Sequence, residues 1–540
     1  MNAFRRFRLR RGTLWMAAIL LASAPFSAFL SAQQTSPDGQ LVIDSVEVSV
    51  VNVDVSVTDR KGDPVPDLRP EDFEIFEDGE PVPITNFDFV IRSRESATPV
   101  APAPVQVSSP TSSSPGSVAD GPAYVVIYFD QINLRPQNRN LLLKQMTGFV
   151  DRGLSPEDQV MVVTAGAGLV VELPFTTDRQ VLRDTLETLR KRSTGRTLDD
   201  GEQQRILSDL ENANENMIGD AVVQLEMAEN AQRAQARATL DTLQYFITAL
   251  AGLPGRKALL YMSDGIAGTT DEELGVFGRI AAAANANRVT FYGFDARGWR
   301  PDSSINPAAR GGNMAELVNS TFNSNLQQPL HELSEATGGF AVTNNTNFDG
   351  ALEKVSTDLG AYYSLGYTPR APNDGQYHRI KVKVTGRGLK VRYREGYLAR
   401  RAMDRLADRT LAALTFHTGA NPLGIVLRPT PVETAADGSR SLPIMVQLPV
   451  RSLSLVPDGD HYKGEVNLLV LIQALDGRMA PAQEIRLPLR IPKAQVEGDK
   501  PSNVAYRLAL PVVETGFKIA VGARDAVSSL ESFATLQIGG

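Results

Sequence analysis

Two apolar segments of this chain each end in an aspartate, and this pattern constrains the fold more than any other feature. The segments are residues 124–130 (YVVIYFD) and 257–264 (KALLYMSD). β-forming apolar residues run through both without alternation, which is typical of buried parallel strands. Because helical patterns lie between and after them, the sequence predicts an open α/β sheet wound on both faces. Ligands of such sheets bind outside the carboxyl ends of the strands, where Asp130 and Asp264 are expected to lie.

Composition limits the classes of protein to which the chain can belong. Its 540 residues are too many for one ordinary domain, and 42% hydrophobic and 22% charged residues are typical of an ordered globular protein. The absence of cysteine excludes disulfides, thiol catalysis and thiolate metal sites. The formal charge of −7 argues against a nucleic-acid partner.

Residues 1–32 have the pattern of a secretory signal peptide, with five arginines, an apolar stretch and a small-residue cleavage point at Ser31 and Ala32. Loss of this segment changes the formal charge from −7 to −12. An uncleaved membrane anchor is the alternative, although Pro25 and several serines shorten the apolar run. No later segment reaches the length of a transmembrane span. We therefore expect an exported protein, periplasmic or extracellular, with no transmembrane span once the signal peptide is removed.

The first part of the mature chain predicts a small domain and a linker. Residues 41–93 alternate between apolar and polar side chains and carry turn signals, which favours a small β, immunoglobulin-like domain. A unit of about fifty residues can form only a marginal hydrophobic core, so it is expected to pack against a neighbouring domain. Residues 94–121 are rich in Pro, Ser and Ala, which is typical of a linker.

The α/β pattern extends over residues 122–400 and includes a helical insertion at about 199–250. Three strands with tight turns between them are expected to close this domain as an antiparallel meander: 362–367, 378–385 and 389–394. Residues 403–540 alternate repeatedly and carry many prolines and turn dipeptides, which predicts a C-terminal β-sandwich domain.

Residues 45–400 contain the stretches VVIYFDQINL, PGRKALLYMSDG, RVTFYGFDARG, YYSLGYTP and IKVKVTGRGLKVRYREGY. In combination, these stretches resemble acidobacterial proteins with a von Willebrand factor A-related domain. The resemblance implies export and a von Willebrand A-like, Rossmann-like domain. The expected architecture is therefore a multidomain α/β plus β protein, in which this doubly wound domain is flanked by two β-sandwich-like domains.

The resemblance also implies a position for a metal-ion-dependent adhesion site. Such sites use an Asp-x-Ser-x-Ser pattern after the first strand, a loop threonine, and an aspartate after the fourth strand. Asp130 and Asp264 match the two aspartates. Ile132 and Leu134 stand where the serines would be, and neither side chain can bind a metal.

Two further residues complete the candidate ligand set. Asn133 lies one residue out of register and offers an amide oxygen, and Thr197 is the candidate loop threonine, with Thr194 as an alternative. The ion expected at such a site is Mg²⁺ or Ca²⁺. We favour the alternative that Asp130 and Asp264 cap nearby helix N-termini and backbone amides, with no cofactor bound.

No enzyme signature stands out in the sequence, which has neither a P-loop nor a Gly-x-Ser-x-Gly motif. The leading interpretation is an exported binding or scaffold protein with a degenerate adhesion site and a protein as its partner. One alternative is a metal-independent structural component of the cell envelope. Another is a hydrolase whose catalytic site has no recognisable motif.

Overall fold

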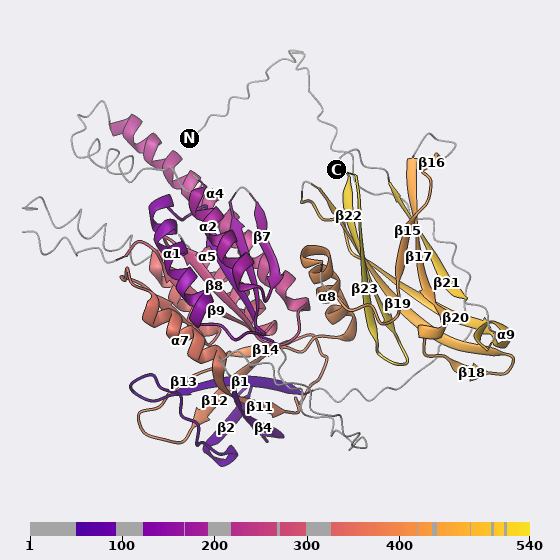
Figure 1. Cartoon of the computed structure of the whole chain (residues 1–540), viewed down its shortest axis with the longest axis horizontal. Helices are drawn as coiled ribbons and strands as arrows, with labels where there is room; N and C mark the ends of the chain where they lie inside the picture. Colours follow the sequence, from indigo (N-terminus) through magenta and orange to yellow (C-terminus); the bar gives the residue numbers. More distant parts are fainter. Residues whose placement is uncertain are drawn as a thin grey trace, which may run out of the picture.

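The computed structural model describes residues 50–92, 122–166, 168–192, 218–266, 271–298, 326–417, 419–434, 440–475, 477–497, 502–511 and 516–539. The predicted signal peptide, the predicted linker and Thr197 lie outside these residues. Figure 1 shows a central α/β domain, with one β sandwich below it and a second β sandwich beside it. The prediction of a multidomain protein that combines α/β and β parts is therefore confirmed.

The central sheet has six strands in the order β10-β9-β8-β5-β6-β7. Neighbouring strands are parallel except for β6 and β7, which are antiparallel. The strands are β5 (Tyr124–Asp130), β6 (Gln159–Ala165), β7 (Leu169–Thr176), β8 (Lys257–Ser263), β9 (Val289–Asp295) and β10 (Phe340–Val342). The order reverses between β5 and β8, so these two strands form the topological switch point of the sheet.

Helices cover both faces of this sheet, which is why its middle strands are continuous apolar runs. Val125 and Ile127 face one layer, and the alternate residues Val126 and Tyr128 face the other. The first layer is α1 (Pro136–Arg152), α2 (Arg179–Lys191) and α7 (Asp349–Gly360). The second layer contains α4 (Ile218–Ala249), α5 (Asp271–Ala286) and a helical segment at 326–336.

Helix α4 is the described part of the predicted helical insertion at 199–250, of which residues 199–217 lie outside the described chain. Its 32 residues make it roughly 48 Å long. The C-terminal half is buried against the sheet through Leu240, Leu243 and Phe246. The other end extends past the body of the domain (Figure 1). Among the described residues, no helix is both long and apolar enough to cross a membrane.

The first β sandwich is built from two stretches of chain that are separated by the α/β domain. Its two sheets have the orders β13-β1-β11-β4 and β14-β12-β2-β3. The strands are β1 (Val51–Thr58), β2 (Phe73–Glu77), β3 (Glu80–Val82), β4 (Asn86–Ile91), β11 (Ala361–Tyr367), β12 (Tyr377–Val384), β13 (Lys390–Arg392) and β14 (Gly396–Leu398). Apolar residues of all the longer strands bury one core between the sheets.

The expected meander at the end of the α/β domain is therefore wrong. Strand β11 pairs with β1 and β4, and β12 pairs with β2 and β14. Strand β12 buries only alternate residues, so its apolar face packs against a second sheet, to which residues 51–91 contribute β1 and β4. The boundaries expected for domains at 41–93 and 122–400 consequently divide one sandwich between them.

Charged side chains fix this sandwich to the amino end of the central sheet. Arg288, which precedes β9, donates to both carboxylate oxygens of Asp54 at 2.9 and 3.1 Å. Arg256, which precedes β8, lies 3.5 Å from the same carboxylate. The first sandwich therefore lies at the end of the sheet opposite the aspartates of the candidate site.

Helix α8 (Ala402–Phe416) opens the C-terminal part of the chain, although only β structure was expected from residue 403. Leu406 and Leu414 pack against the second sandwich, and Ala412 and Phe416 pack into the core of the α/β domain. The helix is apolar on two sides because it lies between two domains. Its 3.6-residue pattern was obscured by the alternating strands that follow it.

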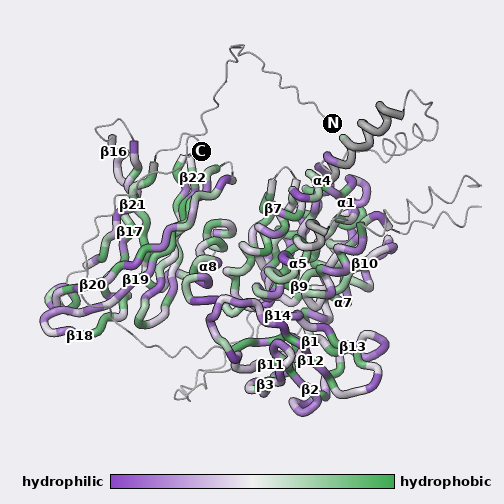
Figure 2. Tube along the Cα trace, turned by 180° about the vertical axis from the view of Figure 1, so that it is seen from behind, coloured by the Kyte–Doolittle hydropathy of each residue, from purple (hydrophilic) through white to green (hydrophobic). Residues whose placement is uncertain are grey.

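The second sandwich has two antiparallel sheets around one apolar core. One sheet contains β15 (Val426–Pro429), β16 (Glu433–Thr434), β17 (Arg440–Pro449) and β21 (Asn503–Pro511). The other contains β18 (Val456–Asp458), β19 (His461–Ala474), β20 (Gln483–Pro492), β22 (Phe517–Asp525) and β23 (Glu531–Ile538). Figure 2 shows hydrophobic stretches alternating with hydrophilic ones along these strands, as the sequence predicts for a sandwich.

Candidate functional site

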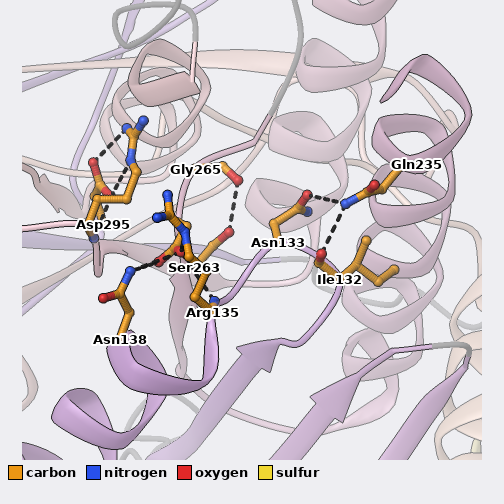
Figure 3. A network of polar contacts seen from close by, with 10 residues as sticks. Ile132, Asn133, Arg135, Asn138, Gln235, Ser263, Gly265 and Asp295 are labelled. Atoms are coloured by element: carbon orange, nitrogen blue, oxygen red, sulfur yellow. Dashed lines mark hydrogen bonds and ion pairs between the residues drawn. The ribbon is translucent and has the colours of Figure 1, made fainter. Parts of the chain in front are cut away.

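The carboxyl ends of three parallel strands bring three aspartates to one edge of the central sheet. Asp130 ends β5, Asp264 follows β8, and Asp295 ends β9. Their side chains are 0%, 6% and 0% exposed. Figure 3 shows the polar side chains that gather around this edge. Each aspartate has its own set of hydrogen-bond donors.

Asp130 accepts hydrogen bonds from four groups. Its Oδ2 accepts from the Tyr261 hydroxyl at 2.5 Å, from Asn133 Nδ2 at 2.7 Å and from the Ser263 hydroxyl at 3.2 Å. Its Oδ1 accepts from the backbone N–H of Asn133 at 3.3 Å. Burial raises the pKa of Asp130, and the donors from Asn133 and Tyr261 oppose that rise. The carboxylate is thus a buried acceptor whose oxygens are engaged by the protein itself.

Asn133 links the loop after β5 to helix α4. Its Nδ2 also donates to the Thr239 hydroxyl at 3.0 Å, and its Oδ1 accepts from Gln235 Nε2 at 3.1 Å. Gln235 donates as well to the backbone carbonyl of Ile132 at 3.0 Å (Figure 3). The amide oxygen that the sequence offered as a metal ligand therefore faces α4.

Asp264 holds the first turn of α1 next to the end of β8. Its two oxygens accept from Asn138 Nδ2 at 2.9 and 3.0 Å, and Oδ2 accepts from the backbone N–H of Arg135 at 3.2 Å. The Arg135 guanidinium Nε lies 3.2 Å from the same oxygen. Burial raises the pKa of Asp264, and Asn138 and Arg135 oppose the rise. Arg135 is the residue before the first turn of α1, so Asp264 caps a backbone amide at a helix N-terminus.

Asp295 is the third acid of the edge and was not among the predicted site residues. It accepts from Arg297 Nε at 2.9 Å and Nη2 at 2.8 Å, and from Gln327 Nε2 at 2.7 Å. The signal was present in the sequence, because Asp295 ends an apolar strand as Asp130 does. The rule that selected Asp130 and Asp264 selects it as well.

The structure brings three of the four predicted site residues together. The backbone N–H of Asp264 donates to the carbonyl of Asn133 at 3.1 Å, and Asn133 contacts Asp130 directly. Leu134 is fully buried in the core, while Ile132 is partly exposed at the rim. The polar residues that sequence reasoning missed are Tyr261, Ser263, Arg135, Asn138, Gln235 and Thr239.

The contacts around Asp130 and Asp264 define what this edge can do chemically. An octahedral Mg²⁺ needs six oxygen ligands, and Ile132 and Leu134 supply none through their side chains. A cation at Asp130 would compete with the Tyr261 and Ser263 hydroxyls for the same oxygen. A cation at Asp264 would also lie near the positive charge of Arg135. The geometry therefore suits structural support of the loops, with Ile132 offering an apolar contact at the rim.

Comparisons with known proteins add little to this geometry. No protein-family model matches the chain, and no curated protein sequence matches it. Among solved structures, the chain is similar to proximal thread matrix protein 1 from the mussel byssus, with 14% identity, a TM-score of 0.23, and coverage of 44% of this chain and 48% of the mussel protein.

Two bacterial structures are similar at the same level. BatB from Bacteroides thetaiotaomicron has 14% identity and a TM-score of 0.23, and the match covers 44% of this chain and 97% of BatB. An aerotolerance-related membrane protein from Bacteroides fragilis has 12% identity and a TM-score of 0.24, with 44% and 98% covered. Because these values are low, the function has to be inferred from the residues of this chain.

Proposed function

We propose that this chain is an exported binding or scaffold protein whose central domain is of the von Willebrand A type. The observation that carries the proposal is the strand order of the central sheet, which reverses between β5 and β8 and ends at an antiparallel β7. In open α/β sheets, ligands bind beside such a switch point. Asp130 and Asp264 lie there, so the carboxyl edge is the surface on which a partner docks.

The proposed contact with the partner does not depend on a bridging cation. The two carboxylates accept hydrogen bonds from tyrosine, serine and asparagine side chains and from Arg135. These bonds, together with those of Asn133 to Gln235 and Thr239, fix the loops after β5 and β8 relative to α1 and α4. A rigid edge loses little conformational entropy on binding, which favours affinity without a metal.

Ile132 is the residue of this edge that we assign to contact with a protein partner. It is partly exposed, although Leu134 of the same loop is buried and Gln235 donates to the backbone carbonyl of Ile132. An aliphatic side chain at a polar rim can bury its surface against an apolar group of the partner. The partner is therefore a protein with an apolar side chain at the centre of its binding surface.

The proposal includes export and a non-catalytic role. Export rests on the sequence pattern of residues 1–32, and the non-catalytic role rests on the engagement of the edge aspartates by structural donors. An acid or base in catalysis has to reach a substrate proton, whereas Asp130 is fully buried beneath Tyr261 and Asn133.

A binding experiment with matched variants tests the proposal. The tagged mature chain, its Ile132→Asp variant and its Val456→Asp variant would each be incubated with the envelope fraction of the native cell. Val456 is 40% exposed on β18 of the second sandwich and provides a matched change of an aliphatic residue to aspartate. We expect one partner to be retained by the parent and the Val456→Asp chain and lost with Ile132→Asp. Equal retention by all three chains would contradict binding at this edge.

A further inference from the structure

A second cluster of polar side chains lies in the first β sandwich, far in the sequence from the candidate site. Glu77, Asp78 and His378 each offer one metal-binding atom, and these atoms lie within 4.8 Å of one another. Asp78 and Gly79 make the turn between β2 and β3 with φ values of +52° and +91°. This left-handed turn lets Glu77 remain buried in the sandwich while the side chain of Asp78 is 53% exposed.

The imidazole of His378 is held on three sides. Its Nδ1 lies 2.8 Å from Asp78 Oδ2, and its Nε2 lies 3.2 Å from Asp374 Oδ2. The ring stacks on Tyr397 with 5.3 Å between the ring centroids. In metal sites, a carboxylate that accepts a hydrogen bond from one ring nitrogen of a histidine commonly orients the ring so that the other nitrogen binds the metal.

The carboxylates of this cluster are also positioned by the protein. Asp78 Oδ1 accepts from the backbone N–H of Arg379 at 2.8 Å, which leaves Oδ2 turned toward His378. Glu77 accepts from the backbone N–H of Arg370 and from the Tyr397 hydroxyl, both at the long distance of 3.3 Å. These two weak bonds leave lone pairs of a buried carboxylate available.

A buried hydroxyl beside Glu77 also supports a ligand site at this cluster. Tyr367 is fully buried, and its hydroxyl makes no well-formed hydrogen bond although it lies close enough to Glu77 to interact with its charge. Buried hydroxyls normally have a partner. This hydroxyl lies beside Glu77 and can donate to a water molecule that completes the ligand shell of an ion bound there.

We propose that His378 Nδ1, Asp78 Oδ2 and one oxygen of Glu77 bind a divalent transition metal of the Zn²⁺ type, with Asp374 orienting the imidazole. One nitrogen and two carboxylate oxygens at about 2.0–2.2 Å are ligands that Zn²⁺ accepts, and a fourth position remains for water. The Nδ1 atom and Asp78 Oδ2, now 2.8 Å apart, need to separate by only a few tenths of an ångström to bind a common ion. The ion would fasten the β2–β3 turn to β12.

The proposal is tested with the mature chain after treatment with a chelator. Calorimetric titration with ZnCl₂ is expected to give one ion per chain, and the thermal midpoint should rise with Zn²⁺ concentration. His378→Ala and Asp78→Asn should both abolish the binding. Asp374→Asn, which keeps all three ligands, should weaken it about ten- to hundredfold. Asp78 is exposed in a turn, so its variant reports on binding even where the His378 variant folds poorly.

His331 supplies the matched control, because it lies in the α/β domain and contacts only Thr343 among the hydrogen bonds of the described chain, at 3.4 Å. His331→Ala should bind Zn²⁺ as the parent does. Absence of binding by the parent would overturn the proposal and leave His378 as a charged bridge between Asp78 and Asp374. Binding that persists in both Asp78→Asn and His378→Ala would overturn it as well.

Discussion

Arg392 and Asp358 form a bidentate ion pair that joins the first β sandwich to the α/β domain. Arg392 Nη1 donates to Asp358 Oδ2 at 2.6 Å, and Nη2 donates to Oδ1. Asp358 lies on α7 and is 2% exposed, and the Ser56 hydroxyl of β1 donates to it at 3.2 Å. The Tyr292 hydroxyl of β9 donates to the same carboxylate at 3.4 Å. The buried carboxylate of Asp358 thus accepts hydrogen bonds from residues of both domains.

Asp358→Ala is expected to destabilise the protein strongly. The variant leaves the guanidinium of Arg392 without its counter-charge in a mostly buried setting, and such a loss typically costs about 3–5 kcal/mol. Urea unfolding, followed by circular dichroism, measures the change in the free energy of unfolding. Asp151→Ala is the control, because its pair with Arg183 is at the surface and should cost only about 0–1 kcal/mol. Similar losses in the two variants would show that the pair does not join the domains.

Gly252→Ala is expected to disturb the contact between the α/β domain and helix α8. Gly252 ends a short 3₁₀ helix (Leu250–Gly252), and a Cβ atom there would lie 2.5 Å from Ala412 Cβ and 2.5 Å from the carbonyl oxygen of Asp408. Overpacking of this kind costs about 1–3 kcal/mol. The same change at Gly278 on α5, where a Cβ would meet no atom within 4 Å, should instead stabilise by about 0.5–1 kcal/mol. Thermal unfolding of both variants checks the opposite signs, and a gain in both would contradict the tight contact.

Lys257 makes the stability of the protein depend on pH in the alkaline range. Its Nζ donates to the carbonyl of Asn287 at 2.8 Å, and the side chain is 3% exposed. Burial lowers the pKa of Lys257 well below its usual range, and the charges of Arg288 and Arg394 lower it further. The unfolded chain therefore binds more protons than the folded chain between the two pKa values. In that window the free energy of unfolding rises with pH.

Lys257→Met removes this titration, so the parent should gain stability relative to the variant as the pH rises from the lowered pKa of the folded state toward the usual lysine pKa of about 10.4. The gain amounts to about 1.4 kcal/mol for each unit by which the folded pKa lies below the unfolded one within that range. Urea unfolding of both chains at several pH values measures the difference. Parallel curves for the parent and the variant would mean that Lys257 is not titrating differently in the folded state.

The sequence allowed the central sheet to be predicted, but not the first sandwich. Continuous apolar runs indicate buried parallel strands, and their carboxyl ends define the edge where Asp130 and Asp264 meet. Alternating strands reveal only which face is buried and not which strand is the neighbour. The pairing of Val55 with Tyr363 joins residues on either side of the α/β domain, and no local pattern carries that information.

Asp130 and Asp264 of the candidate site were predicted from the sequence. Except for Asn133, the residues that donate hydrogen bonds to them were not. Tyr261 and Ser263 reach Asp130 because β8 lies beside β5, so their role depends on sheet order and not on nearby sequence. Gln235 and Thr239 reach Asn133 from α4, a contact that depends on how a long helix crosses the edge. Asp295 could have been found, because it ends an apolar strand in the same way as Asp130.

Photo-crosslinking from position 132 is the sharpest test of whether the carboxyl edge binds a protein partner without a bridging cation. A photoreactive residue would replace Ile132 in the mature chain, and a second chain would carry it at Val456. Both would be irradiated with the envelope fraction in the presence of Mg²⁺ or of a chelator. We predict one crosslinked partner from position 132, in equal yield under both conditions, and none of that partner from position 456. A product that forms only with Mg²⁺ and disappears in Asp264→Ala, or no product from position 132, would contradict the account.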